Sequence, residues 1–155
     1  MELITDRNEA DVARWRTLHD KGWLAMNEDE RSEWLSEMKG RYSHTDMNRV
    51  ESAVQALSSR LTFLGYQHPH LSVKADWKAG DIPTKADFDR YFGNVAALRS
   101  VIAVPGSTPE TPTTEKRFDY LLANDLEKIL EAIDAGTSKI QKPWIFSGDI
   151  FAGEV

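Results

Sequence analysis

His68 and His70 lie in the stretch QHPHL, and histidine is a common ligand of zinc. A zinc site needs three or four ligands that converge on the ion. Pro69 separates the two histidines, and the further candidate ligand nearby is Asp76. Because the spacing marks no third ligand, we interpret this stretch as a solvated loop and predict neither a metal site nor a cofactor.

Acidic side chains occur in closely spaced pairs, such as Asp87 with Asp89 and Glu127 with Glu131. Glycosidases use two carboxylates on opposite sides of a cleft, one of them with a raised pKa. In this chain the acids fall mainly on the polar faces or in the first turns of the expected helices, where they interact favourably with the helix dipole. The sequence also lacks a glycine-rich phosphate loop and a serine nucleophile elbow. We therefore predict no catalytic residues and no enzymatic activity.

Five tryptophans are a high number for a chain of 155 residues. Trp15 and Trp34 fall on apolar helical stripes and are predicted to lie in the core. Trp77 and Trp144 fall at the edges of expected strands, where an exposed ring can stack on a sugar or anchor a protein interface. For Trp77 the pattern favours packing against the helices over sugar stacking. For Trp144 the packed and the exposed role stay equally open.

The composition is that of an acidic globular protein with enough residues for one domain. The formal net charge of −6 disfavours nucleic acid as a partner, because the phosphate backbone is also negative. No apolar run approaches the roughly 18 residues that predict a membrane span, and the stretch MELITDRNEADV lacks the features of a signal peptide. Cysteine is absent, which excludes disulfides and thiolate metal sites. These features favour a cytosolic or virion protein without a membrane partner.

Apolar residues recur at steps of three and four in three long stretches, which predicts three amphipathic helices. The first spans residues 45–64, the second 84–102 and the third 115–135, where Gly136 is the expected stop. The three apolar stripes consist of Met47, Val50, Val54, Leu57, Leu61 and Leu64; of Phe88, Tyr91, Phe92, Val95, Leu98 and Ile102; and of Phe118, Leu121, Leu122, Leu126, Ile129, Leu130 and Ile133.

Two shorter helices are predicted in the N-terminal segment, residues 1–40. Asp6 with Glu9, and Asn27 with Glu30, have the three-residue spacing of a capping box. The segment ends on a glycine, which is a common residue after the last turn of a helix.

Two segments have the patterns of β-strands. Apolar and polar side chains alternate in residues 71–75, which predicts one short internal strand. The closing stretch KPWIFSGDIFAGEV predicts a second strand, in which Ser147 and Gly148 form a bulge. The chain offers few partners for this strand, so we predict that it pairs with another chain. Its interface candidates are Trp144, Phe146, Ile150 and Phe151.

Together the elements predict a mainly α fold. It comprises a small bundle of three long amphipathic helices with two short N-terminal helices, one short internal strand and a C-terminal β-strand arm. The predicted domains are an N-terminal helical segment (1–40), a helical bundle (41–136) with a proline-rich loop at 104–114, and the C-terminal strand arm (137–155).

Five stretches occur in order along nearly the whole chain: TDRNEADVARWRTLHDKGW, WLSEMKGRYSHTDMNRVESAV, ADWKAGDIPTKADFDRYFGNVAALR, LLANDLEKIL and FSGDIFAGEV. They resemble a module of phages and prophages of Firmicutes-type bacteria that is encoded among tail, baseplate and fibre genes. Met47 and Phe92 stand where the module has leucine. The matching positions are Gly40, Tyr42, Thr45, Asp46, Asn48, Arg49, Val50, Glu51, Asp76, Trp77, Pro83, Arg90, Tyr91, Asn94, Leu98, Arg99, Ala123, Asn124, Leu126, Glu127, Lys128, Ile129 and Leu130.

The resemblance implies a structural component of a tailed-phage or prophage virion, located in the tail, baseplate or fibre region, that acts as an assembly or adaptor protein. It implies other virion proteins as partners and a homo-oligomer in the particle. Asp46, Asn48 and Arg49 either cap their helix locally or fix a junction between subunits. The alternative is a carbohydrate- or receptor-binding module of a host-recognition apparatus that uses Trp77 and Trp144.

Overall fold

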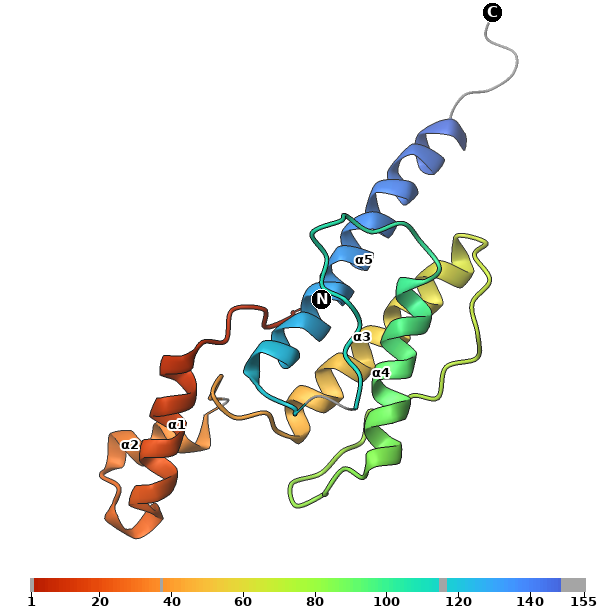
Figure 1. Ribbon diagram of the computed structural model, residues 1–155. Coiled ribbons are helices and arrows are strands. Elements are labelled where there is room, and N and C mark those ends of the chain that lie inside the picture. Colours follow the sequence, from red (N-terminus) through yellow and green to blue (C-terminus); the bar gives the residue numbers. More distant parts are fainter. Residues whose placement is uncertain (1, 37, 115–116, 149–155) are drawn as a thin grey trace, which may run out of the picture.

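Three long helices form the body of the protein. The computed structural model describes residues 2–36, 38–114 and 117–148. Helices α3 (His44–Phe63), α4 (Lys85–Arg99) and α5 (Tyr120–Gly148) pack against one another in all three pairs (Figure 1). The predicted three-helix bundle is therefore confirmed. None of the helices in the described part of the chain is long and apolar enough to cross a membrane.

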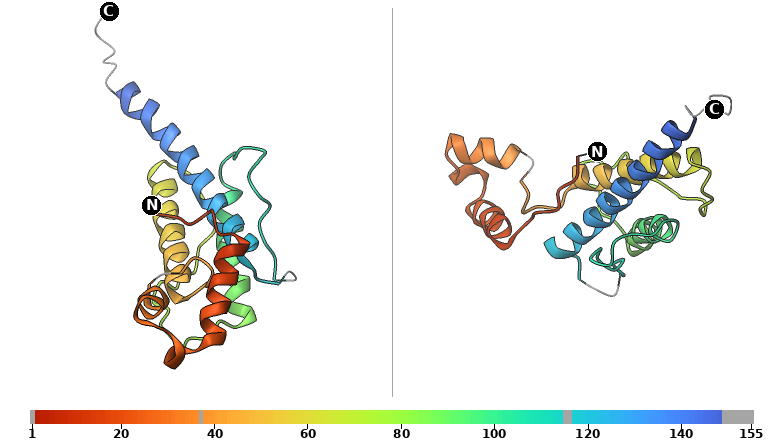
Figure 2. Two further views of the ribbon diagram at one scale, coloured as in Figure 1. Left: turned by 90° about the vertical axis from the view of Figure 1, so that its left-hand side faces the viewer. Right: turned by 90° about the horizontal axis from the view of Figure 1, so that it is seen from above.

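The short N-terminal helices form an arm that projects from the bundle. This arm consists of α1 (Glu9–Lys21), the 3₁₀ turn η1 (Trp23–Ala25) and α2 (Glu28–Leu35). All three views show it beyond the end of the bundle where α5 begins, while the C-terminal end of α5 extends from the opposite end (Figures 1 and 2). The molecule is therefore elongated, with a packed body between two projections.

The apolar stripes of the three long helices meet in one core. Most of the predicted positions are buried, and Phe88, Val104 and Phe118 pack against the core from its edge. Leu121 is an exception, because it is 56% exposed. The fully buried members of the stripes are Val50, Val54, Leu57, Leu61, Tyr91, Val95, Leu98, Leu126, Ile129, Leu130 and Ile133.

Capping boxes set where most helices begin. The predicted pair Asn27 and Glu30 caps α2, and Thr84 with Asp87 caps α4. In such a box the side chain of each residue accepts a hydrogen bond from the backbone N–H of the other, which satisfies donors that the first turn leaves free. The helices therefore start where local sequence provides these acceptors.

The first helix starts two residues later than its sequence predicts. Asn8 and Asp11 form its capping box, in place of Asp6 and Glu9. Asp6 instead accepts hydrogen bonds from Nζ of Lys39 at 2.6 and 2.8 Å. A charged partner from a distant part of the chain thus removes Asp6 from its expected capping role.

The predicted internal strand does not form, and residues 71–75 run extended alongside the helices. The apolar side chains of the alternating pattern still face the core, since Leu71 and Val73 pack against it. Helix side chains replace a partner strand: Nη1 of Arg90 and Nδ2 of Asn94 both donate to the carbonyl of Ser72 at 2.7 Å. The strand prediction was wrong because these two side chains satisfy a backbone group that a sheet ladder would otherwise satisfy.

Asn48 holds the end of this extended segment in the same way. Its Nδ2 donates to the carbonyl of Trp77 at 2.9 Å, and its Oδ1 accepts from the Trp77 N–H at 2.8 Å. We expect Asn48→Ala to lower the free energy of unfolding by about 2 kcal/mol, because two backbone groups lose their partner. Urea unfolding followed by circular dichroism measures this loss. Gln55→Ala, on an exposed position of α3, is the control, and an equal effect of both variants would contradict the role of Asn48.

The predicted C-terminal strand is replaced by helix up to Gly148. Helix α5 runs through Gly136, where a stop was predicted, and includes Trp144 and Phe146. Packing is close at this glycine, because a Cβ at position 136 would lie 3.0 Å from Cδ1 of Ile102. The stretch from 144 to 148 therefore offers its backbone to helical hydrogen bonds, and the remaining interface candidates, Ile150 and Phe151, lie outside the described residues.

Candidate functional site

The chain before the arm is fixed to the bundle by one buried arginine. Arg7 is 4% exposed and lies two residues before α1. Its backbone N–H donates to Oδ1 of Asn124 at 3.1 Å, and its carbonyl accepts from Nδ2 of Asn124 at 2.8 Å. The amide of one α5 residue thus holds both backbone groups of Arg7.

The side chain of Arg7 enters a largely buried charge cluster of four residues: Arg7, Asp46, Arg49 and Glu127. Nη2 of Arg7 lies 2.9 Å from Oδ1 of Asp46 and 2.7 Å from Oε1 of Glu127. Nη2 of Arg49 lies 2.5 Å from Oδ1 of Asp46 and 2.9 Å from Oε1 of Glu127. Two cations and two anions from the N-terminal segment, α3 and α5 therefore neutralise one another.

Both carboxylates of the cluster use their full accepting capacity. Glu127 accepts from the Ile4 N–H, from Nη2 of Arg7, and from Nε and Nη2 of Arg49. Asp46 accepts from both arginines and, through Oδ2, from the N–H and hydroxyl of Ser43. A carboxylate has about four lone-pair sites. This pairing makes the two buried carboxylates tolerable, because an unpaired buried charge is strongly destabilising.

Arg49 is held in its charged state by the carboxylates of the cluster. Burial lowers the pKa of Arg49, but its hydrogen bonds to Glu127 and Asp46 outweigh burial and raise the pKa above its usual range. The guanidinium of Arg7 also lies over the ring of Tyr42, 5.4 Å from the ring centroid. Such a cation–π contact adds to the attraction that keeps the cation in place.

Two tyrosines, the buried Tyr91 and the half-buried Tyr42, lie beside the charge cluster. The hydroxyls of Tyr42 and Tyr91 are 2.5 Å apart. Burial raises the pKa of Tyr42 well above its ordinary value, and burial also raises that of Tyr91. The folded state therefore favours the neutral phenols.

This pair predicts how the protein responds to alkali. Because the folded-state pKa values are raised, the stabilisation is complete below the unfolded tyrosine pKa of about 10 and is lost as the pH rises above it. We expect the ultraviolet absorbance of phenolate to show a late ionisation step that coincides with loss of helical circular dichroism. Tyr42→Phe keeps the ring and should reduce the amplitude of that step, whereas a single early step for all tyrosines would contradict the prediction.

The segment that follows the arm contacts the segment that leads into it. Gly40 packs on the first turn of α1 so closely that a Cβ there would lie 2.0 Å from the carbonyl oxygen of Asp11 and 2.8 Å from the backbone N of Val12. The ion pair between Lys39 and Asp6 joins the same two stretches. We call these two stretches, residues 4–8 and 38–43, the arm root.

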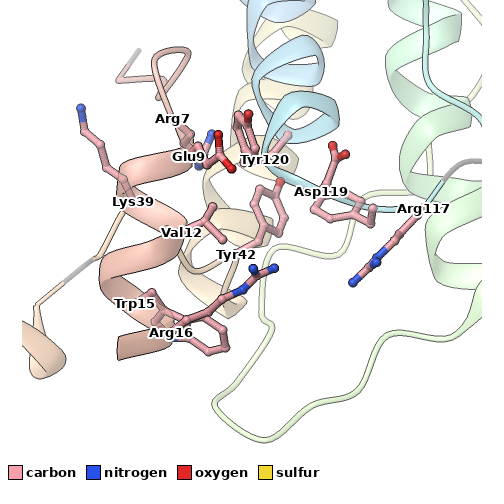
Figure 3. Close-up of a pocket in the computed structure, with 13 residues that line it drawn as sticks. Arg7, Glu9, Val12, Trp15, Arg16, Lys39, Tyr42, Arg117, Asp119 and Tyr120 are labelled. Atoms are coloured by element: carbon pink, nitrogen blue, oxygen red, sulfur yellow. The ribbon is translucent and has the colours of Figure 1, made fainter. Parts of the chain in front are cut away.

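A cleft of about 400 Å³ opens between the arm and the bundle, next to the arm root (Figure 3). Arg16 of α1 and Arg117, which precedes α5, extend into it from opposite sides. Aromatic rings form much of the remaining wall. The lining residues comprise Arg7, Glu9, Val12, Trp15, Arg16, Lys39, Gly40, Tyr42, Arg117, Phe118, Asp119, Tyr120 and Ala123.

The structure brings the predicted junction residues together within one chain. Asp46 and Arg49 belong to the charge cluster, and Asn48 holds the Trp77 backbone. They join α3 to the arm root, to α5 and to the extended segment; a junction between subunits stays a prediction.

The prediction that Trp77 can stack on a sugar needs an exposed ring, and this ring is only 4% exposed. Nζ of Lys74 lies 3.5 Å from its ring centroid, which covers it further. The structure thus supports the packed interpretation that the sequence pattern favoured. For Trp144 the described structure gives the backbone position on α5 alone.

The sequence assigned Glu127 to a solvated face, and this assignment was wrong. Glu127 is fully buried. The available signal was its position four residues after Ala123 and three before Leu130, which places it on the apolar stripe. A charged residue in such a register indicates a buried partner, although the register does not identify that partner.

Many polar residues that carry the phage-module resemblance form hydrogen bonds or ion pairs within the chain. Asp46, Arg49, Asn124 and Glu127 belong to the charge cluster or its support, and Tyr91 binds Tyr42. Asn48, Arg90 and Asn94 hold the extended segment. The first group therefore holds the arm root to the bundle, and the second holds the extended segment to α3 and α4.

No group of three or more side chains able to hold a metal ion occurs within the described ranges of the chain. His68 lies near Ser58 and Thr62 of α3, with Nε2 3.2 and 3.1 Å from their hydroxyls. Comparison of the chain with known protein families, curated proteins and solved structures found no match.

Proposed function

We propose that this protein is a structural component of a tailed-phage or prophage virion, in the tail, baseplate or fibre region, and that it acts as an assembly or adaptor protein rather than as an enzyme. The sequence resemblance supports the location. The observation that carries the assembly role is the arm, which is rooted by buried contacts and presents exposed apolar side chains.

The arm is internally braced. The rings of Trp15 and Trp34 stack with their centroids 6.4 Å apart, and Leu18 and Met26 are buried. Arg14 forms an ion pair with Glu33 between α1 and α2. Because the arm is held both within itself and at its root, it keeps its side chains in a defined orientation relative to the bundle.

The exposed surface of the arm suits a protein partner. Leu24 is 92% exposed, Leu35 75% and Trp23 44%. Exposed apolar side chains on a projecting element favour contact with another protein, because that contact removes them from water. The sugar-binding alternative is not favoured, since Trp77 is buried. The assembly contacts are accordingly assigned to the arm in place of a C-terminal strand over 144–148.

Mass spectrometry of particles purified from the encoding bacterium tests the proposal. We expect the chain in the particles, and we expect Leu24→Asp to reduce its incorporation at least about tenfold, because a charge replaces an apolar contact. Ile82→Asp is the matched control, since Ile82 is 87% exposed but lies outside the arm. Absence of the wild-type chain from the particles would overturn the proposal.

A further inference from the structure

The cleft beside the arm root contains two arginines without an ionic partner among the described residues. Arg7 is neutralised by Asp46 and Glu127, and Lys39 by Asp6. Arg16 and Arg117 extend toward one another across the cleft (Figure 3).

Two like charges that face one another favour an anion between them. The acids of the lining, Glu9 and Asp119, do not bridge the two arginines. In Figure 3 both carboxylates lie above the two guanidinium groups, near Tyr120, and Oδ1 of Asp119 accepts from the Leu122 N–H. An incoming carboxylate can therefore meet both guanidinium groups.

Aromatic rings stand beside the two arginines in the lining of the cleft, namely those of Trp15, Tyr42, Phe118 and Tyr120. Arg16 and Arg117 are themselves exposed, so a ligand in the cleft can reach their guanidinium groups. The cleft therefore combines accessible guanidinium groups with aromatic walls, which suits a peptide with carboxylate and aromatic side chains.

Residues 149–155 of this protein have that chemistry. The sequence DIFAGEV carries Asp149 and Glu154, no lysine or arginine, and one aromatic ring, Phe151. The segment follows directly after α5.

Residues 149–155 are too short to reach the cleft of the same molecule. The cleft lies at the first turn of α5, where Tyr120 and Ala123 line it. The 29 residues of α5 span about 43 Å at 1.5 Å per residue. Seven extended residues reach at most about 25 Å. Only a second copy of the chain can place this segment in the cleft.

We propose that the cleft binds residues 149–155 of a second copy of this protein, with Asp149 or Glu154 between Arg16 and Arg117 and Phe151 against the aromatic wall. This contact deepens the proposed assembly role and rests on it. In this contact a second copy of the chain is the partner, and the charges of both surfaces are specified.

Sedimentation velocity of the full-length protein over a range of concentrations tests the contact. We expect reversible self-association that weakens as salt is added, because exposed charges are screened. Arg16→Glu with Arg117→Glu should raise the dissociation constant at least about tenfold, and Asp149→Arg with Glu154→Arg should do the same. Combining all four substitutions should restore association, because the charges are exchanged between the two surfaces.

Arg41→Glu with Lys128→Glu is the matched control, since it changes the net charge equally at exposed positions outside the cleft. We expect its dissociation constant to stay within about twofold of the wild-type value. A wild-type protein that stays monomeric, or an association that the four-substitution variant does not restore, would overturn this inference. A monomeric protein that is still present in purified particles would leave the assembly role intact, so the two failures can be distinguished.

Discussion

Glu127→Ala is expected to lower the free energy of unfolding by about 3–5 kcal/mol, the largest loss among the single changes considered for this protein. The carboxylate of Glu127 is fully buried and accepts four hydrogen bonds, from Ile4, Arg7 and Arg49. Its removal leaves two arginines with only Asp46 as counter-charge. Urea unfolding of both proteins, followed by far-ultraviolet circular dichroism, measures the difference.

Glu131→Ala on the exposed side of α5 is the matched control and should change stability by less than about 0.5 kcal/mol. A double-mutant cycle sharpens the test. If the loss arises because the arginine charges lose their counter-charge, Arg7→Ala should lower the free energy of unfolding less in the Glu127→Ala background than in the wild type. Additive effects of the two substitutions, or equal effects at positions 127 and 131, would contradict the role assigned to the charge cluster.

Gly40→Ala should open the arm root. A Cβ at this position would lie 2.0 Å from the carbonyl oxygen of Asp11, and backbone cannot move aside as a flexible side chain can. We expect a loss of about 3 kcal/mol, at the upper end of the usual cost of overpacking. The arm should also become more sensitive to protease, because its entering and leaving chains no longer fit together.

Limited proteolysis followed by mass spectrometry locates the expected cleavages, in residues 9–43. Gly106→Ala is the control, since nothing lies within 4 Å of a Cβ at that position. If Gly40→Ala were as stable and as protease-resistant as the control, the close contact between Gly40 and α1 would not be needed to hold the arm.

The sequence by itself determined the helices whose signals are local. The stripe from Met47 to Leu61 and the capping box at Thr84 and Asp87 predicted α3 and α4 closely. Both signals act within one or two turns, so neighbouring residues suffice to express them. The same local reasoning correctly predicted a three-helix bundle, because three apolar stripes of similar length bury one another.

Only the tertiary structure decided what the buried polar residues do. Arg7 and Glu127 are 120 positions apart, and no spacing rule links them. Gly136 resembles a helix stop, yet α5 continues through it, with Ile102 packed beside it. Residues 71–75 have the alternation of a strand, but helix side chains satisfy their backbone. For residues 71–75 the local pattern allowed two structures, and side chains of α4, from farther along the chain, selected one of them.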